Sequence, residues 1–306
     1  MEHTGKFKNI AAMTIFGTIG IFVKYIPFPS SFIAMIRGFV GFAVLFLATS
    51  IIGGTGKKES GRSFKITPAN VLLLFVSGGF IGINWILLFE AYNYTTVATA
   101  TLCYYLAPVF VILLSAPLLR ERLTAKKVIC VIVALIGMAF VSGIPSGGLP
   151  DISELKGILL GTGAAAFYAA VVLFNIKLGG VPATVKTMLQ LISAAIVVCP
   201  YVLMTQDVLS FEYSVKSVLL LLVVGIIHTG IAYLLYFDSL SGLKAQTVSI
   251  LGYIDPVVAI ILSIVILGEP MTPYNAIGAV LILGATLVSE LNIGSCLKAK
   301  KDGEGK

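Results

Sequence analysis

Ten apolar segments of about 20 residues follow one another along this 306-residue sequence, most of them separated by short connections. A helix of about 20 residues rises about 30 Å, which matches the hydrocarbon core of a bilayer. The segments are too long and too continuously apolar for barrel strands, so we expect α-helices. The sequence predicts an all-α polytopic membrane protein with transmembrane helices at residues 9–26, 30–52, 70–92, 95–115, 127–144, 155–176, 183–205, 217–237, 244–267 and 273–291.

The composition supports this class and argues against several others. Hydrophobic residues make up 58% of the chain and charged residues 11%, whereas soluble domains carry about 25% charged residues. The net charge of +7 could indicate a nucleic-acid ligand, but the basic residues lie in short loops and at the termini. The four cysteines are scattered, without metal-ligand spacing. We therefore expect no nucleic-acid partner, no metal site and no cofactor.

The distribution of Lys and Arg predicts the orientation of the chain. One set of alternate loops and termini holds 17 basic residues and the other set holds 3, with Arg37 left inside a span. The positive-inside rule then places both termini in the cytoplasm, in a bacterial-type inner membrane. The basic N-terminus and the apolar run after it resemble a secretory signal, but no small-x-small cleavage site follows. We interpret this run as the first span.

The sequence contains an internal repeat. A shift of 148 residues aligns the third to fifth spans with the eighth to tenth, and 8 of 17 positions from Pro108 to Thr124 are identical. Each half then has five spans, and because five is odd, the second half enters the membrane with opposite polarity. Inverted repeats of this kind are typical of alternating-access transporters. A duplication without mechanistic consequence, as in some channels, is the alternative.

This repeat predicts two inverted five-helix units around a central cavity. The predicted organisation is a cytoplasmic N-terminus, a first unit, an external linker, a second unit and a cytoplasmic tail, at residues 1–8, 9–144, 145–154, 155–291 and 292–306.

Two paired motifs carry a resemblance to a known family. Leu106-Ala-Pro-Val-Phe with Leu119-Arg-Glu-Arg-Leu-Thr, and Ile254-Asp-Pro-Val-Val-Ala with Leu267-Gly-Glu-Pro-Met-Thr, resemble the signature of the drug/metabolite transporter superfamily. The ten-helix branch with two EamA-type domains is most similar. The resemblance implies ten helices around a central cavity that moves amino acids, other metabolites, sugars or toxic compounds. The second motif often reads Glu-Pro in this family, whereas here it reads Asp255-Pro256.

Asp255 is the main candidate for binding the solute. It lies about 16 Å into the ninth span, where an ionised carboxylate costs several kcal/mol unless it meets water, a cation or a donor. We expect Asp255 to bind a substrate ammonium or a coupling proton, and the alternative is a structural ion pair. Arg37, about 10 Å below the outer end of the second span, lies at a similar depth. Arg37 could pair with Asp255 in one state, or brace the fold permanently.

Further candidates come from the repeat and from polar residues within spans. Pro108 and Pro256 occupy matching interior positions, and each should kink its helix, because proline has no N–H and clashes with the carbonyl four residues earlier. Broken helices in corresponding places of two halves indicate a binding site; the alternative is a packing kink. The remaining candidates for substrate binding are Tyr104, Trp85, Asn84, His228, Tyr233, Thr99, Gly252 and Lys24.

Some of these candidates have plainer interpretations. A lone membrane histidine such as His228 usually bonds a neighbouring helix, Lys24 can extend to the interface, and small residues can simply let helices approach closely.

No Gly-x-x-x-x-Gly-Lys-[Ser/Thr] sequence is present, so ATP is not the expected energy source. Two histidines, one of them in the N-terminus, do not supply a catalytic set. We predict a secondary active transporter that exports small metabolites such as amino acids by alternating access, driven by protons or by the substrate gradient. The alternatives are a multidrug, sugar or lipid-linked-sugar carrier and, from other classes, a passive channel or an intramembrane enzyme. The sequence leaves the direction, the coupling ion and the oligomeric state open.

Overall fold

The computed structural model describes residues 2–51, 67–119, 123–146, 150–178, 180–240 and 243–291. All regular structure within these ranges is helical. The elements are α1 Glu2–Lys24, α2 Ser30–Ile51, α3 Pro68–Ala91, α4 Val97–Tyr104, α5 Ala107–Leu119, α6 Ala125–Val141, η2 Ile144–Ser146, α7 Ile152–Lys177, α8 Ala183–Thr205, η3 Val208–Ser210, α9 Val215–Gly225, η4 Ile226–Ile231, α10 Ala232–Leu240, α11 Ala245–Gly252, α12 Ile254–Val265 and α13 Pro273–Glu290.

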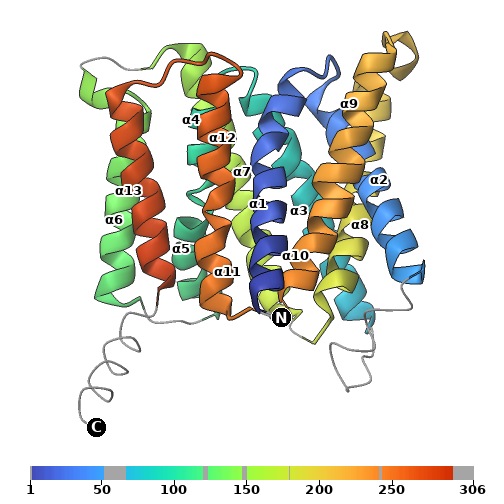
Figure 1. Ribbon diagram of the computed structural model, residues 1–306, viewed down its shortest axis with the longest axis horizontal. Coiled ribbons are helices and arrows are strands. Elements are labelled where there is room, and N and C mark those ends of the chain that lie inside the picture. Colours follow the sequence, from blue (N-terminus) through green and yellow to red (C-terminus); the bar gives the residue numbers. More distant parts are fainter. Residues whose placement is uncertain are drawn as a thin grey trace.

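The helices form one bundle of roughly parallel and antiparallel rods (Figure 1). Nine helical segments among the described residues have the length and apolar character to cross a membrane. The tenth crossing is α6, which has 17 residues and lies beside α13 in Figure 1. Seventeen residues rise about 26 Å, which is close to the hydrocarbon thickness. The predicted all-α, multi-span architecture is confirmed.

The two halves of the chain run through the bundle with opposite polarity. We call the end where α1 begins the lower end, and the opposite end the upper end, as drawn in Figure 1. Helix α5 ends and α6 begins at the lower end, whereas α12 leads into α13 at the upper end (Figure 1). Since α5–α6 and α12–α13 correspond under the 148-residue shift, the predicted inversion is present in the fold.

The repeat also extends to helix termini. Thr124 and Thr272, which the shift pairs, are the N-caps of α6 and α13, and each hydroxyl accepts a bond from the backbone N–H three residues later. An N-cap side chain satisfies one of the four N–H groups that a helix leaves unpaired at its start, which matters more when water is scarce. The chain is also interrupted after Tyr104 and after Gly252, again paired positions.

Helix α1 differs most from its predicted span. It begins at Glu2 rather than at residue 9. Hydropathy marks only the apolar part of a helix, so it does not show that the helix continues into polar residues. The extra turns are held by α10: Lys8 forms an ion pair with Asp238, and the Asn9 amide donates to the Ser239 hydroxyl at 2.9 Å. The eighth span contains a wider turn, η4, which the sequence pattern did not predict.

Glycines allow close helix crossings, as at Gly78 of α3. A Cβ there would lie 2.5 Å from the Ser193 Cβ and 2.6 Å from the Gln190 carbonyl oxygen, both on α8. Small residues at such crossings let helix backbones approach closely in membranes.

We therefore expect Gly78→Leu to destabilise the protein by about 3 kcal/mol, because the α8 backbone has no room to move aside. The measurement is the thermal unfolding midpoint of purified protein in detergent. Gly284→Leu is the matched control, since a Cβ at Gly284 of α13 meets nothing within 4 Å. Equal midpoints for the two variants would contradict the close-crossing interpretation.

Candidate functional site

A cavity of about 430 Å³ lies inside the bundle and is lined by both halves of the chain. This volume is within the usual range for small-molecule sites. Toward the upper end it is lined by Leu88, Phe89 and Tyr92, and toward the lower end by Ser249 and Glu290. The cavity thus lies in the middle of the bundle, between the two repeats, where the sequence predicted a central cavity.

Eight of the predicted site residues line this cavity together. They are Arg37, Asn84, Trp85, Tyr104, Pro108, Tyr233, Gly252 and Asp255. They come from α2, α3, α4, α5, α10, α11 and α12, so helices of both repeats contribute. Trp85 and Tyr233, which the repeat pairs, both lie on the cavity wall.

Asp255 lies in the first turn of α12. The Tyr105 hydroxyl donates to its carboxylate at 2.9 Å and approaches the Gly252 carbonyl oxygen at 3.4 Å. A carboxylate in the first turn of a helix is also favoured by the positive end of the helix dipole. One donor and the helix terminus therefore partly satisfy this charge, while the side chain still lines the cavity.

Arg37 is buried on α2, with 6% of its surface exposed. Its Nε donates to the Thr229 hydroxyl at 2.8 Å, and the guanidinium lies 4.1 Å from the centre of the Trp85 ring. Stacking on an aromatic face stabilises a cation, and more strongly when water is excluded. Among the described residues no ion pair joins Arg37 to Asp255, although both side chains line the same cavity.

The prolines mark breaks rather than kinks in continuous helices. Helix α4 ends at Tyr104 and α5 starts at Ala107, one residue before Pro108. Helix α11 ends at Gly252 and α12 starts at Ile254, two residues before Pro256. Proline is tolerated in the first turn of a helix, where its missing N–H would be unpaired anyway. The chain thus places two helix ends and two helix starts around the cavity.

These residues lie in a chain whose relatives indicate its family. Residues 4–143 and 155–290 match the EamA-like transporter family. A protein of Bacillus subtilis named uncharacterized transporter YxxF is 33% identical over 284 residues, which cover 92% of this chain and 88% of that protein. The chain belongs to the EamA-like transporter family.

Two other comparisons agree with this membership. An uncharacterized transporter of Archaeoglobus fulgidus is 26% identical over 288 residues, covering 93% of this chain and 96% of that protein. A solved crystal structure with a TM-score of 0.63 covers 95% of this chain and 97% of its own, and at 21% identity it shows a shared fold alone. This EamA-like transporter is therefore a multi-pass membrane protein that moves small molecules across a lipid bilayer.

His228 does not line the cavity of this EamA-like transporter. It is 1% exposed, and its Nε2 lies 2.8 Å from the Thr18 hydroxyl of α1. Its Nδ1 lies 3.3 Å from the Val223 carbonyl oxygen. These contacts give His228 two polar partners within the protein, as the plainer interpretation of a lone membrane histidine expects.

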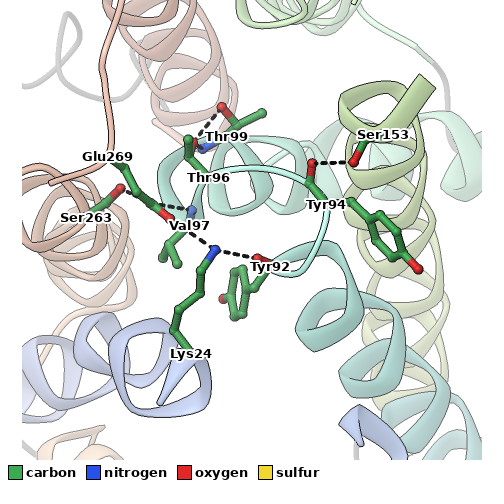
Figure 2. Close-up of polar contacts among 9 residues, drawn as sticks. All are labelled: Lys24, Tyr92, Tyr94, Thr96, Val97, Thr99, Ser153, Ser263 and Glu269. Carbon is green, nitrogen blue, oxygen red and sulfur yellow. Dashed lines mark hydrogen bonds and ion pairs between the residues drawn. The ribbon is translucent and has the colours of Figure 1, made fainter. Parts of the chain in front are cut away.

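Thr99, Lys24 and Pro256 also lie outside the cavity lining. Thr99 is near the start of α4, and its hydroxyl accepts from Thr96 at 2.9 Å. Lys24 forms an ion pair with Glu269 at 3.2 Å near the upper end (Figure 2). Asn84 lines the cavity, but its amide donates to the Ala164 carbonyl oxygen of α7 at 2.6 Å. Part of its hydrogen-bonding capacity is therefore used to hold α3 and α7 together.

The cavity contains further polar residues that were not among the sequence candidates. Besides Tyr104, Tyr233 and Tyr236, which were expected there, its wall includes Tyr92, Tyr105, Tyr168, Tyr253 and Glu290. The one available sequence signal was the repeat, which pairs Tyr105 with Tyr253, each three residues before one of the paired prolines. Tyr92 directly follows α3, a position typical of an interfacial aromatic anchor, yet it is 3% exposed.

Proposed function

We propose that this EamA-like transporter is a secondary active exporter of small metabolites such as amino acids, working by alternating access. The lower end faces the cytoplasm of a bacterial-type inner membrane, in accordance with the positive-inside distribution of Lys and Arg. The two units, residues 9–144 and 155–291, exchange roles as the cavity opens to one side and then to the other.

The single observation that carries this proposal is that Arg37 and Asp255 line one cavity without forming an ion pair with each other. Arg37 can bind a carboxylate of the solute, and its planar guanidinium suits bidentate binding. Asp255 offers an acceptor for an ammonium group. A zwitterion can pair with Arg37 and Asp255 at once. These two contacts replace the hydration that the zwitterion loses when it enters the cavity.

The fold supports alternating access in two ways. Inverted repeats let each half adopt the conformation of the other, and broken helices near the membrane centre place polar backbone groups at the solute. Both features meet at the same cavity, between α4 and α5 and between α11 and α12. The driving force is a proton gradient, with Asp255 as proton acceptor, or the gradient of the substrate itself.

A multidrug carrier is the second candidate, and the tyrosines favour it. Tyr104 and Tyr168 lie with ring centres 5.5 Å apart, and Tyr105 and Tyr253 with centres 6.3 Å apart. Rings around a carboxylate are suited to organic cations through cation–π attraction. Such a carrier would need Asp255 but not Arg37, which separates the two candidates experimentally.

The test is counterflow in liposomes that contain the purified protein. We expect a labelled amino acid to accumulate transiently against excess unlabelled solute inside, with saturable kinetics. A panel of zwitterions, amines and sugars compares the candidate substrates. Uptake of amines alone would favour the multidrug carrier, and non-saturable conduction of ions would indicate a channel and contradict the proposal.

A further inference from the structure

The upper end of the bundle contains a compact group of polar contacts centred on Glu269 (Figure 2). Its carboxylate accepts the backbone N–H of Val97 at 2.8 Å and the Ser263 hydroxyl. Lys24 forms an ion pair with the same carboxylate at 3.2 Å, and donates to the Tyr92 carbonyl oxygen at 2.5 Å. One carboxylate therefore gathers three donors from three different helices.

These contacts cross between the two halves of the chain. Lys24 ends α1 and Val97 begins α4 in the first half, whereas Glu269 follows α12 in the second half. The bond to Val97 also satisfies one of the N–H groups that α4 leaves unpaired at its start, where the helix dipole favours an anion. The Glu269 side chain is only 12% exposed, and such a partly buried, charge-assisted contact is stronger than a surface ion pair.

The same group of contacts is connected to the cavity. Tyr92, whose carbonyl accepts from Lys24, lines the cavity at its upper side. Helix α4 packs against α12 and is bonded to it at both ends: Val97 to Glu269 above, and Tyr105 to Asp255 below. Opening a path from the cavity to the upper end therefore requires α1 and α4 to separate from Glu269, and Lys24 to release the Tyr92 carbonyl that follows α3.

The lower end differs from this arrangement. Among the described residues, Lys8 pairs with Asp238 between α1 and α10, and Lys126 donates to the Leu291 carbonyl between α6 and α13. None of these four residues lines the cavity, whereas Ser249 and Glu290, near the lower end, do. The contacts centred on Glu269 thus lie above the cavity and include the backbone of Tyr92, a residue of its wall.

We infer that Lys24 and Glu269, with the Val97 N–H and the Tyr92 carbonyl that they hold, form the upper gate of this transporter. The gate is closed in this structure and must open for solute to reach or leave the cavity from the upper side. This inference rests on the alternating access proposed above, and it assigns Lys24 to the gate instead of to the solute.

The test measures access to the cavity from outside the cell. Leu88, which lines the upper part of the cavity, is replaced by Cys in full-length protein whose four native cysteines are changed to Ala. A membrane-impermeant maleimide is then added to intact cells without any solute. We expect Lys24→Gln and Glu269→Gln each to raise the labelling rate about tenfold, and the double variant to raise it no further, because both remove one shared interaction.

The matched controls are Lys216→Gln and Glu212→Gln, which remove the same charges from exposed residues close to the start of α9, at the same end of the bundle. Their labelling rates should equal that of the parent protein. Unchanged labelling in the Lys24 and Glu269 variants, with normal amounts of folded protein, would overturn the gate. If labelling rises but counterflow is absent from the parent, the gate stands and the proposed function fails. If the parent shows counterflow but labelling is unchanged in the Lys24 and Glu269 variants, the proposed function stands and the gate fails.

Discussion

Asp255→Asn should strongly reduce transport while leaving the amount of folded protein in the membrane unchanged. Asparagine keeps the size of the side chain and can still accept from the Tyr105 hydroxyl, which lies 2.9 Å from the carboxylate in the parent protein. It cannot bind an ammonium as an anion does, or carry a proton. A hydrogen bond to a charged group contributes about 1.5–3 kcal/mol, so we expect a loss of about 10- to 150-fold in initial rate.

The measurement is the initial rate of counterflow in liposomes containing equal amounts of each variant. Asp207→Asn, which removes an exposed carboxylate from the connection before α9, is the matched control and should transport normally. Asp255→Glu restores the charge with one more methylene, and should recover part of the rate. Full activity of Asp255→Asn would remove this residue from the transport mechanism and leave it as a structural acceptor for Tyr105.

The sequence predicted the fold well because two independent regularities agree. Apolar length gave the spans, and the 148-residue repeat gave their inversion and the paired positions of the breaks. The residues on the cavity wall were harder to predict, because the side of a helix on which a residue lies depends on how the helix is rotated about its axis. His228 was assigned to the cavity because the repeat pairs it with Phe80 near the middle of the third span, but it lies within η4, Ile226–Ile231, which is a π-helical turn. A π-helical turn is wider than an α-helical one, so its side chains do not follow the spacing of a regular α-helix.

Thr99 illustrates a second limit of the same kind. Its assignment to the cavity placed Thr99 and Tyr104 on one helix face. Both lie in the unbroken helix α4, where five residues correspond to a rotation of about 140°, so they point in different directions. Thr101, three residues before Tyr104, lines the cavity in place of Thr99. Lys24 could not be assigned from its own segment at all, because its partner Glu269 is 245 positions away in the sequence. Only the packing of α1 against α12 brings the two together.

The Arg37 variants test the positively charged group on the cavity wall. Arg37→Gln removes the charge, and Arg37→Lys keeps a charge but loses the planar group that lies over Trp85 while Nε donates to Thr229. Lysine has no flat face to stack and no fork for a carboxylate, so the substitution is not conservative here. We expect about a 100-fold loss of amino-acid counterflow for Arg37→Gln and about a tenfold loss for Arg37→Lys.

Solute analogues separate a binding role for Arg37 from a structural one. If Arg37 binds the solute carboxylate, the decarboxylated amine of the same solute should be moved equally well by the parent and by Arg37→Gln, and poorly by Asp255→Asn. A solute acid that lacks the ammonium should show the opposite pattern. A structural role predicts instead that Arg37→Gln lowers the unfolding midpoint and slows every solute alike, because the bond to Thr229 joins α2 to η4. The two variants and two analogues together therefore decide whether the separated charges serve one zwitterion.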